Sequence, residues 1–339
     1  MTEHRPPPTG LLPVRRRRRE RWLDQSPTWE QARPAVIQAA VVRASARPTG
    51  NWYVLGASSS LRPGRSAARY VAGRELVVWR ATGGDVHAGP GACPHLGAPL
   101  CGGPVDGADL VCHWHGMRLG PAGTPAWRTH PCHDDGALLW VRLDSIGGED
   151  PTPLPPRTHR PDPRTALTAV TCVAGRCEPR DILANRLDPW HGAWFHPYAF
   201  GALRVSESPP ADLPRDTPAG TDRFLVEVEF RLGRRFAVPV TAAFTAPGPR
   251  TVVMEIISGE GAGSVVETHA TPLRGPDRPA RSIVTEAVVA ASGRRGFALA
   301  RALAPLVRPA VRRTAARLWR DDIAYAERRH LLRTRTDPL

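Results

Sequence analysis

Two short segments, each pairing one cysteine with one histidine, constrain this chain more than any other feature. The first holds Cys93 and His95, and the second, which begins after sixteen further residues, holds Cys112 and His115. A [2Fe–2S] cluster with two thiolates on one iron and two imidazoles on the other needs this ligand set. A structural zinc site is the alternative, but zinc fingers usually pair Cys with Cys and His with His. The spacing therefore favours an iron–sulfur cluster held between two loops.

Both segments resemble the two cluster loops of Rieske non-haem iron oxygenases, of the aromatic-ring-hydroxylating alpha-subunit type. The similarity is carried by Cys93–Leu100 and Cys112–Gly116 and extends over the stretch from about Asn51 to Asp144. The resemblance implies an all-β domain of small antiparallel sheets, with the two loops forming one tip.

The same comparison separates this cluster from the respiratory-complex type, which carries an extra cysteine in each loop and a serine after the second. Ala98 and Trp114 occupy the places of the cysteines, and Met117, which cannot donate a hydrogen bond, occupies the place of the serine. Fewer hydrogen bonds to the sulfurs imply a low potential, towards about −150 mV.

A second motif follows, with Asn185, Asp188, His191 and His196 in the pattern N-x-x-D-x-x-H-x-x-x-x-H. Two imidazoles and one carboxylate on one face of Fe(II) leave positions open for O₂. Alone, such a pair also occurs by chance or at a helix cap, and imidazole suits several metals. Behind a Rieske motif, the pattern resembles the mononuclear iron motif of the same oxygenases. The resemblance implies that His191 and His196 are iron ligands.

The resemblance implies that Asp188 is not a ligand. In the family, the Asp at the corresponding place bridges, through hydrogen bonds, a mononuclear-site histidine and a cluster histidine of a neighbouring subunit. By position, that cluster histidine is His115 in this chain. A carboxylate suits this task because it accepts from two ring N–H groups at once. The resemblance also places Asn185 near the iron, although an ordinary helix-surface or capping Asn is the alternative.

The resemblance places the third iron ligand, a carboxylate, in a C-terminal helix. Asp321 and Asp322 are neighbours there and would point about 100° apart, so only one can face the iron. The family pattern has a Glu five residues after the ligand, and Glu327 is five residues from Asp322. Asp322 is therefore the preferred ligand and Asp321 is the alternative. The aspartate that is not the ligand is expected to be solvated.

The amino-acid composition limits which classes of partner molecule are expected. The 339 residues carry a net charge of +14, and every basic residue is Arg. No basic face interleaved with aromatics is visible, so we expect no nucleic-acid partner. The charge would steer an acidic electron donor such as a ferredoxin. An anionic membrane surface, or a solvated surface without a special partner, are the alternatives.

The six cysteines do not suggest a disulfide scaffold. Cys101, Cys132, Cys172 and Cys177 lack ligand spacing and are expected to be ordinary thiols, and no bridge is expected between Cys172 and Cys177 in a reducing compartment. The sequence has no uninterrupted apolar stretch of about 18 residues, so no transmembrane helix is expected. The arginines at 15–19 lack a following apolar region, so no signal peptide is expected and the predicted location is cytoplasmic.

The predicted domain organisation has four parts. Residues 1–47 form a basic Pro/Arg-rich arm with a short helix over 28–46, and residues 48–145 form the Rieske domain. A Pro-rich linker covers 146–163, and a catalytic domain covers 164–335.

Periodicity predicts α+β structure in the catalytic domain. Alternation also predicts strands over 71–79 and 138–143 in the Rieske domain. The strands expected in the catalytic domain are 224–232, 236–245, 251–257, 265–271 and 283–290, and the helices are 179–187 and 296–332. The resemblance implies a helix-grip, START-like fold: an antiparallel sheet around a long C-terminal helix.

Together the two sites imply an oxygenase that takes single electrons from an NAD(P)H-dependent reductase or a ferredoxin and activates O₂ at Fe(II). We expect oxidation, first of all hydroxylation, of a hydrophobic small molecule by a monooxygenase, with dioxygenation the nearest alternative. A Rieske electron carrier and an inactive relative that binds an apolar ligand are the competing classes. The family's usual assembly is a homotrimer. The basic C-terminal helices either contact a membrane peripherally or pack on their own sheet.

Overall fold

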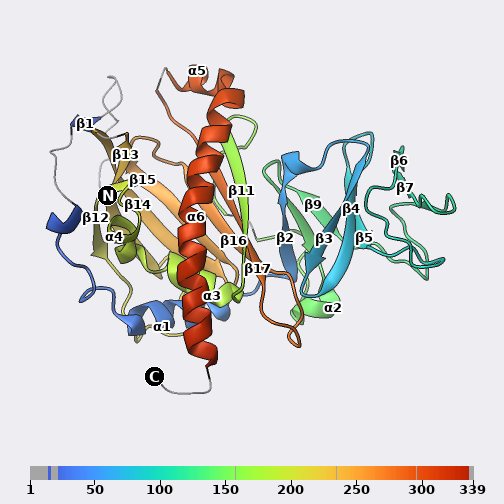
Figure 1. The fold of residues 1–339 in the computed structure, drawn as a ribbon, viewed down its shortest axis with the longest axis horizontal. Coiled ribbons are helices and arrows are strands. Elements are labelled where there is room, and N and C mark those ends of the chain that lie inside the picture. Colours follow the sequence, from blue (N-terminus) through green and yellow to red (C-terminus); the bar gives the residue numbers. More distant parts are fainter. Residues whose placement is uncertain (1–13, 17–21, 157, 234, 295, 336–339) are drawn as a thin grey trace.

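The structure is a computed structural model that describes residues 14–16, 22–156, 158–233, 235–294 and 296–335. Figure 1 shows small sheets at one end of the molecule and one large sheet, crossed by a long helix, at the other. The small sheets lie in the N-terminal half of the sequence, and the large sheet takes all but one of its strands from residue 167 onward. This order confirms the predicted class, a small β domain followed by an antiparallel sheet with a long C-terminal helix.

Three antiparallel sheets of three strands build the N-terminal part. Their orders are β2-β10-β9, β3-β4-β5 and β6-β7-β8. The strands are β2 (Trp52–Ala57), β3 (Arg65–Val71), β4 (Arg74–Arg80), β5 (Val86–Pro90), β6 (Val105–Asp106), β7 (Asp109–Val111), β8 (Arg118–Leu119), β9 (Cys132–Asp134) and β10 (Leu138–Arg142). The strand predicted over 71–79 is present as β4 but begins three residues later, because Val71 ends β3 and a hairpin turn follows it. Ala72 and Gly73 form this turn with φ of 47° and 84°, as a type I′ turn requires.

The large sheet has eight strands, in the order β11-β17-β16-β15-β14-β13-β12 with β1 paired to β14, and all of its pairs are antiparallel. The strands are β1 (Arg15–Arg16), β11 (Leu167–Gly175), β12 (Phe200–Glu207), β13 (Arg223–Leu232), β14 (Phe236–Gly248), β15 (Thr251–Gly259), β16 (Val265–Pro272) and β17 (Ser282–Ala290). The five predicted strands are all present. The strands β11 and β12 lie outside them and close the two ends of the sheet.

The helices are α1 (Pro34–Ser45), α2 (Asp144–Gly147), α3 (Pro179–Arg186), α4 (Gly192–Phe195), α5 (Phe297–Ala302) and α6 (Ala304–Thr334). Short 3₁₀ turns are η1 (Trp22–Asp24), η2 (Ser58–Ser60) and η3 (Pro189–His191). The helix predicted over 296–332 is interrupted at Leu303, because Pro305 has no N–H to donate to the preceding turn. Helix α6 packs along β11 and against α3, and Figure 1 shows it crossing the sheet.

Helix α1, from the segment predicted as an arm, contributes to the core of the large sheet. Its buried side chains share one apolar cluster with α3, α6 and the inner face of the sheet. The residues from α1 are Val36, Ile37, Ala40, Val41 and Ala44. A helix that precedes the Rieske segment in the sequence therefore completes the core of the large sheet.

The two parts are joined by a buried polar network. Arg160 lies within the predicted linker and pairs with Asp135, beside β10, at 2.6 Å, and with Glu267, on β16, at 2.8 Å. His269 Nε2 lies 3.1 Å from the Glu267 carboxylate. Burial opposes ionisation of Glu267, but His269 and Arg160 outweigh it and lower the pKa of its carboxyl. The linker thus fastens the small sheets to the large one by charge as well as by apolar contact.

Among the described residues, none of the helices has the length and apolar character that crossing a bilayer requires. All six cysteines are free thiols. Cys172 is exposed on β11, whereas Cys177 is fully buried.

Candidate cluster and metal sites

The two predicted cluster loops, which hold Cys93 and Cys112, have the same backbone hydrogen bonds. In each loop the cysteine N–H donates to the carbonyl oxygen five residues later, at 2.8 Å for both Cys93 and Cys112. The cysteine carbonyl accepts from the glycine four residues later, at 2.9 Å for Gly97 and 2.8 Å for Gly116. Both glycines have left-handed φ, 73° and 75°, which a side chain would disfavour. Each loop is therefore a tight turn with the same backbone hydrogen bonds, although the histidine is two residues after Cys93 and three after Cys112.

The loops place thiols with thiols and imidazoles with imidazoles. Cys93 and Cys112 are 4% and 1% exposed and hydrogen-bond each other, whereas His95 and His115 are exposed with ring centroids 4.9 Å apart. The Met117 sulfur lies 4.0 Å from the Cys93 sulfur, where a serine could have donated a hydrogen bond. The donor set fits a cluster with a buried cysteine edge and an outward histidine edge.

Large apolar side chains surround the histidine edge. Leu96 is 64% exposed and Trp114 is 53% exposed, each next to a histidine of the pair. The sheet β6-β7-β8 lies at the end of the molecule away from α4 (Figure 1). The histidine edge is therefore flanked by exposed apolar side chains.

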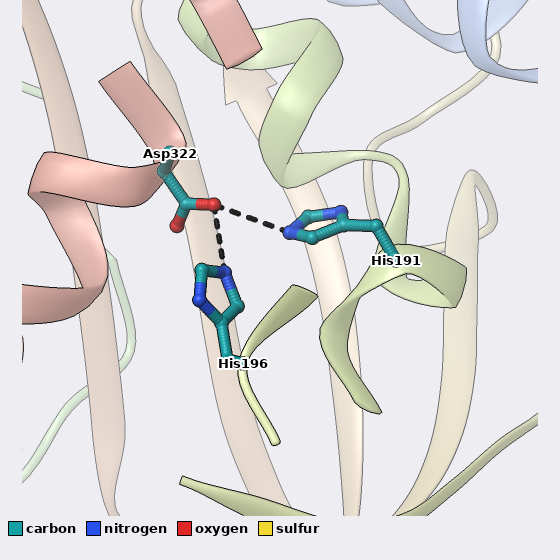
Figure 2. A group of neighbouring side chains, drawn as sticks. All are labelled: His191, His196 and Asp322. Carbon is teal, nitrogen blue, oxygen red and sulfur yellow. Dashed lines mark hydrogen bonds and ion pairs between the residues drawn. The ribbon is translucent and has the colours of Figure 1, made fainter. Parts of the chain in front are cut away.

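The second motif lies where α3, η3, α4 and α6 meet. A capping box between Glu178 and Asp181 starts α3, and Pro189 opens the tight turn that follows it. This turn brings His191 close to His196, which follows α4, while α6 supplies Asp322 (Figure 2).

The three side chains converge on one point. Asp322 Oδ1 lies 3.2 Å from His191 Nε2 and 2.9 Å from His196 Nε2, and the three ligand atoms lie within 4.8 Å of one another. Asn185 Nδ2 donates to the same oxygen at 3.0 Å. Burial raises the pKa of the Asp322 carboxyl, but the two histidines outweigh it, so the pKa falls below its usual value. The group offers two imidazole nitrogens and one anionic oxygen on one face.

The other ring nitrogens are held from behind. His191 Nδ1 lies 2.5 Å from the Asp188 carbonyl oxygen, and His196 Nδ1 lies 3.5 Å from Asp321 Oδ2. The Tyr198 hydroxyl donates to the same Asp321 oxygen at 2.5 Å. Such partners fix the ring orientation of metal-binding histidines.

Asp321 is therefore not simply solvated, as the sequence had suggested for the residue that is not the ligand. Its side chain is 37% exposed, and it contacts Tyr198, whose ring lies 3.7 Å from the Arg317 guanidinium carbon. Glu327 lies elsewhere and accepts from the backbone N–H of Arg176 at 2.7 Å.

Asp188 lies beside the histidine pair but outside the converging group. Its Oδ2 accepts from the Tyr325 hydroxyl at 3.2 Å, while its Oδ1 is buried with no hydrogen-bond partner among the described residues. Burial is the main cause that raises the pKa of its carboxyl. A buried carboxylate oxygen without a hydrogen-bond donor is energetically costly.

Sequence reasoning missed two aromatic residues at this site, Tyr198 and Tyr325. Helical spacing could have found Tyr325, because it lies three residues after Asp322 on α6 and so faces the same way. Tyr198 carries no such signal, because it lies in a turn.

A pocket opens beside the converging group. Its walls away from the motif are mainly apolar. They include Phe200, Leu203, Val226, Val228, Phe230, Phe244, Met254, Leu318 and Trp319. Two charged side chains, Arg186 and Glu286, also line it. A mainly apolar lining with a few polar groups is typical of a small-molecule site.

Two family models match the chain. The model described as Rieske [2Fe-2S] domain matches residues 51–139, and the model described as Domain of unknown function (DUF5914) matches residues 146–337. The second match covers more than half of the chain.

Among curated proteins, the chain is similar to a vanillate O-demethylase oxygenase subunit of a Pseudomonas species, with 25% identity over 167 residues. That match covers 46% of this chain and 50% of the relative. The chain thus spans about half the length of the curated relatives it matches.

Among solved structures, the fold is similar to dicamba monooxygenase bound to dicamba, with a TM-score of 0.59, 17% identity and coverage of 88% and 92% of the two chains. It is also similar to a chain of the reduced complex between oxygenase and ferredoxin in carbazole 1,9a-dioxygenase, with a TM-score of 0.52, 14% identity and coverage of 87% and 86%. The chain therefore belongs to the DUF5914 family and carries a Rieske [2Fe-2S] domain, and its fold is similar to that of the dicamba and carbazole oxygenases.

Proposed function

We propose that this chain is the terminal oxygenase of a Rieske system and oxidises, most simply by hydroxylation, a hydrophobic small molecule. The observation that carries the proposal is the convergence of His191, His196 and Asp322 on one point beside an apolar pocket. Monooxygenation is the first choice because the vanillate and dicamba relatives are a demethylase and a monooxygenase by name.

The residues fit the two metal groups that such an enzyme uses. Cys93, His95, Cys112 and His115 supply the donor set of a [2Fe–2S] cluster, and His191, His196 and Asp322 supply that of a mononuclear Fe(II). When bound, these groups provide single-electron transfer and O₂ activation, chemistry that the side chains alone do not offer.

The protein's own contribution is position and exclusion of water. Asn185 and the two imidazoles hold the Asp322 carboxylate in one orientation from three sides. The apolar walls keep the pocket dry and hold a hydrophobic molecule against the converging group.

Asp188 is proposed as the bridge between the two centres of neighbouring subunits. Its carbonyl holds His191, its Oδ2 is held by Tyr325, and its buried Oδ1 is free to accept from an N–H of another chain. An exposed cluster histidine, His115, is the proposed donor, and the apolar side chains beside it would be covered in such an interface.

A ring in which each cluster serves the next subunit's metal site follows from this route, and a homotrimer is the proposed closure. The separation of the cluster end from α4 within one chain supports a route between subunits (Figure 1). A ferredoxin or an NAD(P)H-dependent reductase is the proposed electron donor, supported by the ferredoxin complex of the carbazole relative and by the net charge of +14. The cytoplasmic location and the domain boundaries remain predictions.

The competing classes are less well supported. An electron carrier would need no carboxylate beside the histidine pair, and an inactive ligand-binding relative would leave both aspartates turned away. Asp322 points at both imidazoles instead.

The test is to count metal and follow O₂ in the same preparation. Purified anaerobically and reconstituted, the protein should hold about three iron and two acid-labile sulfide per chain, whereas the other classes hold about two iron. With a surrogate ferredoxin and reductase, O₂ uptake should depend on added hydrophobic substrate. A reducible cluster with two iron per chain and no substrate-dependent O₂ uptake would refute the proposal.

A further inference from the structure

The pocket beside the metal site is lined by a charged side chain, Arg186, with a buried donor that has no hydrogen-bond partner among the described residues. Arg186 is the last residue of α3 and directly follows Asn185, which holds the Asp322 carboxylate. Its Nε is buried without a hydrogen-bond partner, and no ion pair or hydrogen bond joins its guanidinium to another group in the described part of the chain. A buried donor without a hydrogen-bond partner is energetically costly, and an arginine cannot reduce this cost by losing its proton.

Aromatic rings hold this guanidinium in place. Its central carbon lies 5.4 Å from the centre of the Phe244 ring and 5.8 Å from the centre of the Trp319 ring. Stacking on rings fixes the plane of a guanidinium but uses none of its N–H groups. The arginine is thus positioned, and its donors are kept for something else.

Glu286 lines the same pocket without taking up those donors, and burial raises the pKa of its carboxyl. It is buried on β17, and its Oε2 accepts from Trp319 Nε1 at 2.7 Å, so the carboxylate is held on its other side. Both side chains line the same pocket as His191, His196 and Asp322. The rest of the wall away from the metal motif is mainly apolar, so Arg186 and Glu286 form one polar spot beside a hydrophobic surface.

We propose that the Arg186 guanidinium anchors a carbonyl-type oxygen, of a carboxylate or a ketone, on a mainly apolar substrate. The inference rests on the proposed function and deepens it: by fixing one end of the molecule, the anchor selects which carbon faces the His191–His196–Asp322 group. Arginine suits this task because its planar fork of donors matches an sp² oxygen.

The test is direct binding to the reconstituted protein, measured anaerobically by titration calorimetry, without a reductase. Three probes share one ring system: naphthalene, 2-naphthoate and 2-acetylnaphthalene. The wild-type protein should bind at least one of the two oxygenated probes about tenfold or more tighter than naphthalene, as expected for a hydrogen bond to a charged donor. The tighter of the two shows whether a carboxylate or a ketone is preferred.

Arg186→Met and Arg186→Gln should each bring the three affinities to within about twofold of one another. Leu318→Ala is the matched control, because it removes apolar wall from the same pocket and should weaken all three probes alike. An unchanged cluster spectrum verifies the fold of each variant.

Equal binding of all three probes by the wild-type protein would overturn the proposal, as would a preference that survives in both Arg186 variants. Neither result depends on turnover. Failure of the oxygenase assignment, seen as absent substrate-dependent O₂ uptake, is therefore distinguishable from failure of the anchor.

Discussion

The adjacent carboxylates on α6 offer the sharpest test of the metal site. Asp321→Asn and Asp322→Asn are the same chemical change at neighbouring positions, yet the two oxygens lie on opposite sides of His196. Asp322 Oδ1 lies 2.9 Å from Nε2 and is on a side chain only 6% exposed, whereas Asp321 Oδ2 lies 3.5 Å from Nδ1 and is 37% exposed. Asp322→Asn removes an anionic ligand, whereas Asp321→Asn removes only a partially screened partner of the ring.

The expected magnitudes differ accordingly. Loss of an outer partner of a metal-bound histidine typically weakens metal affinity by 10- to 100-fold, and the exposure of Asp321 places it near the lower end, about tenfold or 1.4 kcal/mol. Loss of the Asp322 charge should exceed about a hundredfold, or 2.7 kcal/mol, because the ligand itself is neutralised in a buried site.

The assay is anaerobic competition for Fe(II) against a chelator of known affinity, followed by iron counting after desalting. Asp322→Asn should fall from about three to about two iron per chain, while Asp321→Asn should keep its third iron at saturating metal. The visible spectrum of the cluster controls for folding in both variants. If Asp321→Asn lost the metal and Asp322→Asn retained it, the assignment of the third ligand would be reversed and the reasoning refuted.

Three further outcomes follow from the same structure. Asp188→Asn should keep both metal centres but slow cluster reoxidation in a single turnover by about tenfold or more, because an amide offers one acceptor where the bridge needs two. Arg160→Met should lower the free energy of unfolding by about 3 kcal/mol at pH 7, measured in urea, because Glu267 loses its cation. Because the pKa of Glu267 is depressed in the folded protein, this contribution is present above about pH 4.5 and should be lost as the pH falls below it. Iodoacetamide at pH 8 should alkylate Cys172 but not Cys177, since burial raises the pKa of the Cys177 thiol to about 12 and leaves about 10⁻⁴ of it as thiolate.

Each of these has a contrary result. Normal reoxidation with full product yield in Asp188→Asn would refute the role of Asp188 as the bridge. A protein that is monomeric by sedimentation and still turns over would refute electron transfer between subunits. A loss under about 0.5 kcal/mol in Arg160→Met would mean that the ion pair does not fasten the two parts. Equal labelling of Cys172 and Cys177, read by mass spectrometry, would contradict the burial of the second thiol.

The cluster loops show how far the sequence alone reaches. Ligand type, spacing and the glycines after each histidine are local properties, because each loop is a turn whose hydrogen bonds stay within six residues. The strands of the large sheet were predictable for the same reason, since alternation along β13 to β17 is read directly from the chain. The hairpin at Ala72 was not, because periodicity does not mark where one strand ends and the next begins.

Only the tertiary structure decided how distant segments meet. The choice between Asp321 and Asp322 depends on the rotation of α6 against the sheet, and adjacent residues differ there by about 100°, which no periodic pattern in an Arg-rich helix resolves. The assignment of α1 to the core, the unpartnered oxygen of Asp188 and the free guanidinium of Arg186 arise in the same way. They concern which polar atoms find partners after packing, and a sequence states what each residue can donate or accept but not what it will face.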